Sequence, residues 1–312
     1  MWNRPDMAIW QGRVDDEEHG DSRRWHQLVL PASEGVAPGV ALLGFACDEG
    51  VRRNHGRPGA RQAPMAIRAA LANLAWHHPQ PLYDAGDVAC EGEALEAAHA
   101  ELSAHVGSLL AAGHRPLVLG GGHEVAFGSF VGLADYLANQ VPTARVGILN
   151  LDAHFDLRQA AQANSGTPFR QIAEDCARRG WPFHYACFGV AEPSNTEALF
   201  ERARALGVAF RLDEQMSVAQ LPEALSAVQA FVAGVDHLYL TIDLDVLPAW
   251  QAPGVSAPAP RGVALEVVEA IIDMVKASGK LRLADLAELN PTQDIDSRTA
   301  KTAARLVYRL AK

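Results

Sequence analysis

The sequence predicts an α/β fold in which helices cover both faces of a mainly parallel sheet. Short apolar runs rich in Val, Ile and Leu alternate with longer amphipathic or Ala-rich segments along the chain. The short runs are apolar on both sides, as expected for strands that are buried on both faces of a sheet. No internal repeat, low-complexity linker or break in composition divides the 312 residues, so we expect a single domain.

Six apolar runs are the strongest strand candidates, and two weaker candidates lie near Leu82 and Val208. The six predicted strands are residues 40–45, 115–119, 145–151, 184–188, 237–242 and 281–286. The segments between them predict helices at residues 63–76, 93–112, 125–138, 167–179, 195–206, 218–232, 265–277 and 297–310. Such sheets bind ligands at the carboxyl ends of their strands, so we look for functional side chains there.

The composition limits the kinds of partner. Lys and Arg number 27 against 37 Asp and Glu, which gives a formal net charge of −10, and 49% of the residues are hydrophobic. The hydrophobic share excludes global disorder. The negative charge argues against nucleic acid and against an anionic membrane surface as the main partner. Taken alone, it also argues against an anionic small substrate.

The chain ends and the cysteines indicate a cytoplasmic protein. The first twenty residues have no apolar core after basic residues, so we expect no signal peptide, and no run approaches the roughly 18–20 apolar residues of a membrane span. The four cysteines are far apart and form no CxxC pair, which predicts free thiols in a reducing compartment. They are Cys47, Cys90, Cys176 and Cys187.

Acidic and histidine side chains follow three of the predicted strands. Asp152, His154 and Asp156 come after the strand at 145–151, and in extended backbone alternate residues point to one side. Asp243 and Asp245 repeat this spacing after the strand at 237–242. A lone pair of this kind is more often a helix cap or a solvated turn, but the two groups would share one edge of the sheet.

A glycine run follows the third strand. Gly120, Gly121 and Gly122 precede His123 and allow a sharp turn that places one imidazole at the same edge. Taken alone, this run is more often a tight turn or a phosphate-binding loop. Together with the two aspartate groups it completes a set of two histidines and four aspartates.

This set predicts two divalent cations. Four carboxylates in close proximity cannot all stay ionised without compensating positive charge. Carboxylate and imidazole ligands without thiolate suit Mn²⁺, with Fe²⁺, Co²⁺, Ni²⁺ or Zn²⁺ as alternatives. Two such cations about 3.5–4 Å apart would hold a bridging water and make it hydroxide near neutral pH.

These motifs resemble those of the arginase/agmatinase (ureohydrolase) family. The matching segments are residues 121–123 (GGH), 150–156 (NLDAHFD), 241–245 (TIDLD) and 285–291 (DLAELNP). The resemblance implies a three-layer arginase-like α/β fold, with residues 1–312 as one catalytic domain on which an N-terminal extension, residues 1–38, packs. It further implies two Mn²⁺ per subunit, hydrolysis of a C–N bond in a guanidine or amidine, and a homo-oligomer.

The resemblance also implies roles for single residues. One metal would be held by His123, Asp152, Asp156 and Asp243, and the other by Asp152, His154, Asp243 and Asp245. Asp152 and Asp243 would then bridge the two metals. Asp156 would accept a proton from the hydroxide and donate it to the leaving amine, while Glu288 would bind the planar cationic group of the substrate.

Two departures from the commonest family pattern resemble its formimidoylglutamase branch. Gly122 and Glu124 replace the usual Asp and Ser around His123, and Ser165 stands where agmatinases carry a substrate-contacting His. This branch hydrolyses N-formimidoyl-L-glutamate to glutamate and formamide by a metal-bridged hydroxide, in histidine degradation. The absence of this histidine at Ser165 disfavours arginine and agmatine as substrates.

The arginines after the first strand fit a dicarboxylate substrate. We expect one or two of Arg52, Arg53 and Arg57 to contact its carboxylates, because a guanidinium suits forked carboxylate binding. Surface ion pairs are the alternative for most of them. Four of the chain's negative charges belong to the expected metal ligands, so the net charge no longer disfavours an anionic substrate.

Two other functions remain open from the sequence. A guanidino acid such as guanidinobutyrate also has an anionic tail, so the arginines do not exclude a ureohydrolase acting on it or on agmatine. A metal-binding regulator is possible as well, although a complete ligand set with Glu288 disfavours it. In every case we expect a small-molecule ligand and neither nucleic acid nor membrane.

Overall fold

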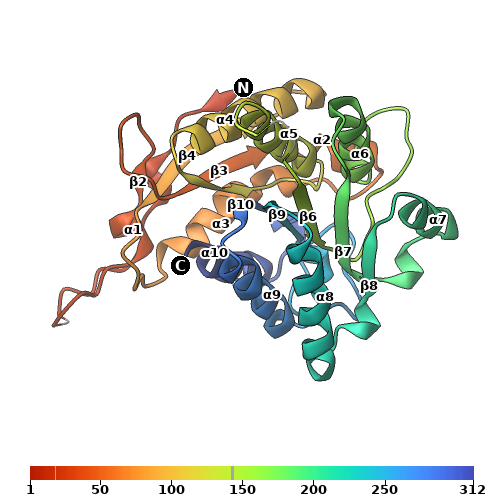
Figure 1. Ribbon diagram of the computed structural model, residues 1–312. Helices are drawn as coiled ribbons and strands as arrows, with labels where there is room; N and C mark the ends of the chain where they lie inside the picture. Colours follow the sequence, from red (N-terminus) through yellow and green to blue (C-terminus); the bar gives the residue numbers. More distant parts are fainter. Residues whose placement is uncertain (18, 142–143) are drawn as a thin grey trace.

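The computed structural model describes residues 1–17, 19–141 and 144–312, and its middle layer is one sheet (Figure 1). The strands are β1 (Trp2–Asn3), β2 (Leu30–Pro31), β3 (Val40–Ala46), β4 (Leu82–Ala89), β5 (Arg115–Leu119), β6 (Val146–Leu151), β7 (His184–Val190), β8 (Ala209–Leu212), β9 (His237–Asp243) and β10 (Leu281–Ala287). Their order is β1-β4-β3-β5-β10-β9-β6-β7-β8, with β2 beside β4.

The sheet is mainly parallel, as predicted. Every pairing from β4 through β8 along this order is parallel, and only the short β1 pairs antiparallel, with β4. Because β5, β10, β9 and β6 are adjacent and parallel, their carboxyl ends lie at one edge. This register brings the four segments with the predicted functional side chains together.

Helices form the two outer layers. They are α1 (Trp25–Leu28), α2 (Glu49–Arg53), α3 (Ala63–Ala72), α4 (Leu95–Ala111), α5 (Val125–Ala138), α6 (Pro168–Arg179), α7 (Glu197–Ala205), α8 (Leu221–Ala233), α9 (Leu265–Ala277) and α10 (Arg298–Ala311). Helices α3, α8, α9 and α10 pack into one hydrophobic core, and α4, α5, α6 and α7 pack into a second core on the other face (Figure 1). Within the described residues, no helix has the length and apolarity needed to cross a lipid bilayer.

The predicted helices exist, but some boundaries differ. Helix α3 ends at Ala72 rather than at residue 76, and Asn73 then accepts a hydrogen bond from the backbone N–H of Arg13 (2.7 Å). Helix α8 begins at Leu221 because residues 218–220 form a 3₁₀ turn. The short helices α1 and α2 were not predicted, since four or five residues carry too little periodicity.

The N-terminal segment is attached to the edge of the sheet at β4. Trp10 and Trp25 are buried and stack with ring centroids 6.4 Å apart. The Trp10 indole N–H donates to Asp84 Oδ2 (2.8 Å), and the same carboxylate lies 2.8 Å from the Nε of Arg68. Both members of this ion pair are almost completely buried, at 3% and 1% exposure.

Because Asp84 would be left as an uncompensated buried charge, we expect Arg68→Ala to lower the free energy of unfolding by about 3–5 kcal/mol. Arg145→Ala is the matched control, because its ion pair with Asp236 is exposed and should contribute less than about 1 kcal/mol. Urea unfolding of the two variants measures both values. Equal losses of unfolding free energy would show that burial does not increase the contribution of the Arg68–Asp84 ion pair.

Candidate metal centre

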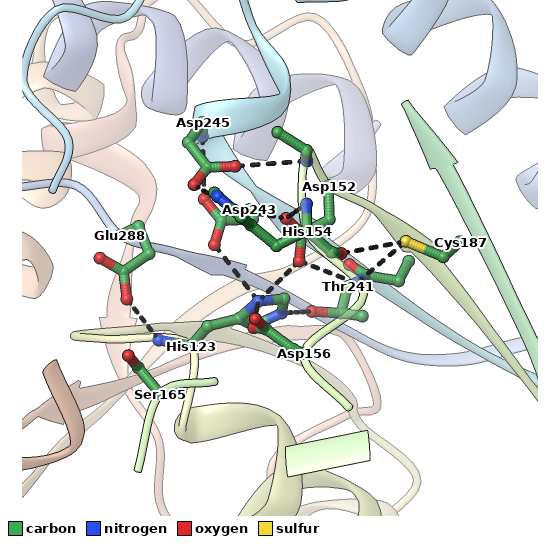
Figure 2. Close-up of polar contacts among 12 residues, drawn as sticks. His123, Asp152, His154, Asp156, Ser165, Cys187, Thr241, Asp243, Asp245 and Glu288 are labelled. Carbon is green, nitrogen blue, oxygen red and sulfur yellow. Dashed lines mark hydrogen bonds and ion pairs between the residues drawn. The ribbon is translucent and has the colours of Figure 1, made fainter. Parts of the chain in front are cut away.

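The predicted ligands converge at the carboxyl edge of the sheet (Figure 2). All of them except Asp152 line a cavity of about 330 Å³. They form two groups. Within each group, the candidate ligand atoms all lie within 4.8 Å of one another. The first group contains His123, Asp152, Asp156 and Asp243, and the second contains Asp152, His154 and Asp245.

The first group surrounds one nitrogen of His123. His123 Nδ1 lies 3.0 Å from Asp152 Oδ2, 2.9 Å from Asp156 Oδ2 and 3.2 Å from Asp243 Oδ2. It makes an aligned hydrogen bond to none of them. The other ring nitrogen, Nε2, is 3.0 Å from the hydroxyl of Thr241, which fixes the orientation of the ring.

The second group shares Asp152 with the first. His154 Nδ1 lies 3.0 Å from Asp245 Oδ2 and 3.5 Å from Asp152 Oδ1, so each oxygen of Asp152 faces a different histidine. Asp243 belongs to the first group only. Its Oδ1 accepts a hydrogen bond from the backbone N–H of Asp245 (2.8 Å). The geometry therefore gives Asp152 the bridging position that the resemblance implies, and bridging by Asp243 stays a prediction.

Turns rather than extended backbone bring the aspartates together. Strand β6 ends at Leu151, after which Asp152 Oδ1 accepts the backbone N–H of His154 (2.6 Å) and Asp156 has a φ of 47°. Asp243 is the last residue of β9, and Asp245 lies in a 3₁₀ turn that Asp243 caps. The prediction that alternate residues of a strand point to one side is therefore wrong here, although the expected convergence occurs.

The glycine run allows close backbone contact between two loops. A Cβ on Gly121 would lie 1.6 Å from the carbonyl oxygen of Cys47, and Gly122 donates its N–H to that same oxygen (3.0 Å). A Cβ on Gly122 would lie 2.1 Å from Glu124 Oε2. The two unusual residues flanking His123 are thus coupled, because the buried Glu124 carboxylate occupies the space that a larger residue at 122 would need.

The donor set fits divalent cations. Three carboxylate oxygens surround the Nδ1 atom of His123, and this nitrogen makes an aligned hydrogen bond to none of them. Carboxylate and imidazole ligands together suit Mn²⁺ and related metals. Burial, followed by the Asp245 and Asp152 carboxylates, raises the pKa of Asp243 well above the usual range. Bound cations would remove this like-charge repulsion.

Glu288 lines the same cavity from the end of β10. Its Oε1 accepts the backbone N–H of His123 (2.8 Å), and it is 6% exposed (Figure 2). Burial and the neighbouring Glu124 carboxylate raise the pKa of Glu288 to about 8. A cationic group bound beside Glu288 would favour the ionised form and lower this pKa.

Strained backbone accompanies the cavity. Glu288 and His55 have left-handed backbone, with φ of 70° and 60°, and both line the cavity together with Asp156. Such conformations in non-glycine residues persist where the surrounding structure enforces them, and they are common at functional sites.

Only some of the predicted substrate-binding residues line the cavity. Ser165 lines the cavity, and its hydroxyl accepts a hydrogen bond from Asn54 Nδ2 (3.1 Å). Arg57 also lines the cavity, but its guanidinium donates to the carbonyls of Val255 and Ser256 and to the Gln293 side chain.

Arg52 and Arg53 do not line this cavity. Both donate to Glu49, and they pair further with Glu93 and Glu96, respectively. This is the ion-pair role that the sequence left open as the alternative. Their contact with substrate stays a prediction, and the geometry disfavours it.

The predicted site residues leave out several residues that line the cavity, among them Asn54, His55 and Arg158. Arg158 lies two positions after Asp156, so its place next to a predicted ligand was the available signal. Asn54 and His55 follow the unpredicted helix α2, and their inward position depends on where that helix ends.

The chain is similar to known proteins over nearly its whole length. Residues 38–312 match the Arginase family. The formimidoylglutamase of Aeromonas hydrophila is 61% identical over 314 aligned positions, which cover 100% of this chain and 99% of that protein. The formimidoylglutamase of Ralstonia nicotianae is 59% identical, with 99% of this chain and 96% of the relative covered.

Solved structures confirm the predicted fold. The formimidoylglutamase of Bacillus subtilis superposes with a TM-score of 0.83 at 21% identity, over 96% of this chain and 95% of that one. The Trypanosoma cruzi formiminoglutamase with Mn²⁺₂ gives 0.81 at 25% identity, over 93% and 98%. The arginase of B. subtilis gives 0.73 at 22% identity, over 88% and 98%.

We expect the metal-free protein to release at least two protons per chain when it binds Mn²⁺ at pH 7, one from each histidine. Burial lowers the pKa values of His123 and His154, but the adjacent carboxylates outweigh burial and hold both pKa values well above 6.5. Both histidines are therefore protonated before the metal binds, and a ligand nitrogen must be neutral.

Titration of weakly buffered protein with Mn²⁺ in the presence of a pH indicator measures the release. His154→Ala should reduce it by about one proton. If equilibrium dialysis shows Mn²⁺ bound without proton release, the two histidines are not its ligands.

Proposed function

The chain belongs to the arginase family, and we propose that it acts as a Mn²⁺-dependent formimidoylglutamase. It hydrolyses N-formimidoyl-L-glutamate to L-glutamate and formamide, a step of histidine degradation. One observation carries the proposal: the buried Glu288 lines the same cavity as five of the six candidate metal ligands. The chain that carries this site is matched from end to end by relatives of this activity.

Two Mn²⁺ per subunit would be held by His123, Asp152, Asp156 and Asp243 and by Asp152, His154 and Asp245. When bound, they supply the positive charge that ionises water near neutral pH and stabilises negative charge on the substrate. Carboxylate and imidazole ligands alone favour this metal over a thiolate-binding one.

Glu288 orients the substrate. Its Oε1 is held by the backbone N–H of His123, which leaves Oε2 to accept N–H donors of the planar amidinium. The amidine carbon then lies on the ligand side of the cavity, where water attacks it. Pairing with the cation keeps Glu288 ionised although burial alone raises its pKa.

Asp156 moves the proton. Asp156 Oδ2 lies at the cavity wall, 2.9 Å from His123 Nδ1, so its carboxylate is placed to accept a proton from the attacking water. It takes the proton from the attacking water and donates it to the glutamate nitrogen. The bond between the amidine carbon and that nitrogen breaks, and formamide and glutamate leave.

The runner-up is a ureohydrolase acting on a guanidino acid such as guanidinobutyrate, or on agmatine. The presence of Ser165 at the cavity wall weighs against it, because the guanidine-hydrolysing members carry a histidine there.

Four buried free cysteines support a reducing, cytoplasmic setting. The homo-oligomer is proposed from the family resemblance.

We expect the Mn²⁺-loaded protein to release formamide and glutamate from N-formimidoyl-L-glutamate and no urea from agmatine or guanidinobutyrate. Glu288→Gln keeps the shape but removes the charge that pairs with the amidinium, so kcat/KM should fall about 10- to 100-fold. Steady-state assays of glutamate release measure both effects.

Glu266→Gln is the matched control, because Glu266 is exposed on α9 and should leave kcat/KM unchanged. Metal content of each variant is measured in parallel, so that loss of Mn²⁺ is not mistaken for loss of substrate binding. Urea production without formamide release would overturn the proposed substrate. Full activity of Glu288→Gln would overturn the role of that carboxylate.

A further inference from the structure

A second cavity lies at the amino edge of the sheet. Its volume is about 360 Å³, which is close to the 330 Å³ of the cavity at the metal ligands. Its wall is formed where β5, β9 and β10 begin and where α4 and α5 end. The polar residues of this wall are His114, Arg115, Tyr136, Gln140, His237 and Arg282.

The wall of this cavity carries positive charge without a compensating carboxylate. Among the described residues no Asp or Glu lines it, and Arg115 and Arg282 form no ion pair within them. Asp135 and Asp236 precede two of the lining residues in the chain, but each pairs with an arginine outside the cavity, at 2.8 Å. The cavity therefore favours a negatively charged ligand.

The two arginines differ in how much of their guanidinium is free. Arg115 Nη2 donates to the carbonyls of Leu310 and Ala311 at the end of α10 (2.9 and 3.1 Å). Arg282 is exposed, and its Nε donates to His237 Nδ1 (3.2 Å). Its two Nη atoms have no hydrogen-bond partner in the part of the chain that the structure describes. Arg282 is therefore the arginine that a ligand can use.

The two histidines offer further N–H donors. His114 Nδ1 accepts the backbone N–H of Gly39 (3.2 Å), and His237 Nδ1 accepts from Arg282. In each neutral ring the hydrogen is then on Nε2, and neither Nε2 has a partner within the described residues. Because His114 is only 6% exposed, an unpaired N–H on its ring is costly unless a ligand supplies an acceptor.

This cavity is separate from the metal centre. Strands β5, β9 and β10 have five, seven and seven residues and run from the cavity to the metal edge. At about 3.3 Å per residue, the two ends of these strands lie about 15–25 Å apart. His123, Asp243 and Glu288 lie at the carboxyl ends, so a small ligand in the second cavity cannot contact the metal ligands.

We propose that this cavity is a second ligand site, which binds a small anion through phosphate or carboxylate oxygens. A guanidinium donates two parallel N–H groups to such oxygens, which gives direction as well as attraction. The Arg282 Nη atoms supply this fork. The rings of His114 and His237, the Tyr136 hydroxyl and the Gln140 amide supply further donors on the same wall.

Calorimetric titration of the Mn²⁺-loaded protein with inorganic phosphate and, separately, with malonate tests the site. We expect Arg282→Ala to raise the Kd of the bound anion about 10-fold or more, because it removes charge-assisted hydrogen bonds. The probe that binds more tightly shows whether the site prefers phosphate or carboxylate.

Two further variants make the result specific. Arg282→Lys keeps the charge without the fork and should restore part of the affinity. Arg4→Ala removes an exposed arginine that does not line the cavity, and it should leave the Kd unchanged.

Crystals of the Mn²⁺-loaded protein soaked in selenate, which has the shape of phosphate, locate the anion directly. We expect an anomalous selenium peak within hydrogen-bond distance of Arg282. Selenium peaks only elsewhere would overturn the site. So would binding that Arg282→Ala leaves unchanged, or no binding of either probe at millimolar concentration. These results do not depend on which substrate the metal centre hydrolyses, so the proposed function can fail or stand independently.

Discussion

The site depends on one electrostatic constraint: five buried carboxylates lie close together at one edge of a sheet. They are Asp152, Asp156, Asp243, Asp245 and Glu288, and all but Asp152 line the same cavity. Desolvation and mutual repulsion raise the pKa values of four of them, which shows how unfavourable the arrangement is without cations. Cations at two points relieve this repulsion, and the same positive charge is what ionises water for hydrolysis.

The fold satisfies this constraint by placing parallel strands side by side in a different order from the sequence. Strands β5, β10, β9 and β6 are neighbours, so segments separated by more than a hundred residues meet at their carboxyl ends. His123 is oriented by Thr241 on β9, and its backbone N–H holds Glu288 from β10. One histidine therefore links the expected metal site to the expected substrate site.

Much of the fold was readable from the sequence because buried parallel strands are continuously apolar. Strand β4 gave a weak signal because Asp84, Gly86 and Asp87 interrupt its apolar pattern. The buried Arg68 that pairs with the two carboxylates lies on the preceding helix, α3, and the sequence does not show that contact. The convergence of the six candidate metal ligands was predicted from their places after strands. The turns that aim them were not, since the left-handed backbone of Asp156 depends on packing around it.

The sequence does not predict which arginines form ion pairs in the fold. The sequence shows five arginines close together after β3, but it does not show which find carboxylate partners. Helix α2 places Arg52 and Arg53 in ion pairs with Glu49. Arg158 belongs to another segment, and its guanidinium has no partner within the described residues. Ion pairing is a long-range property of the fold, and it decides which cations remain for a substrate.

The six candidate ligands should hold two cations, one on each histidine. Anomalous diffraction at the manganese absorption edge, from crystals grown with Mn²⁺, tests it most directly. We expect two peaks in each chain, one bound by His123 Nδ1 and the other by His154 Nδ1, with Asp152 in contact with both. A single peak, or peaks that leave either histidine without metal, would contradict the account.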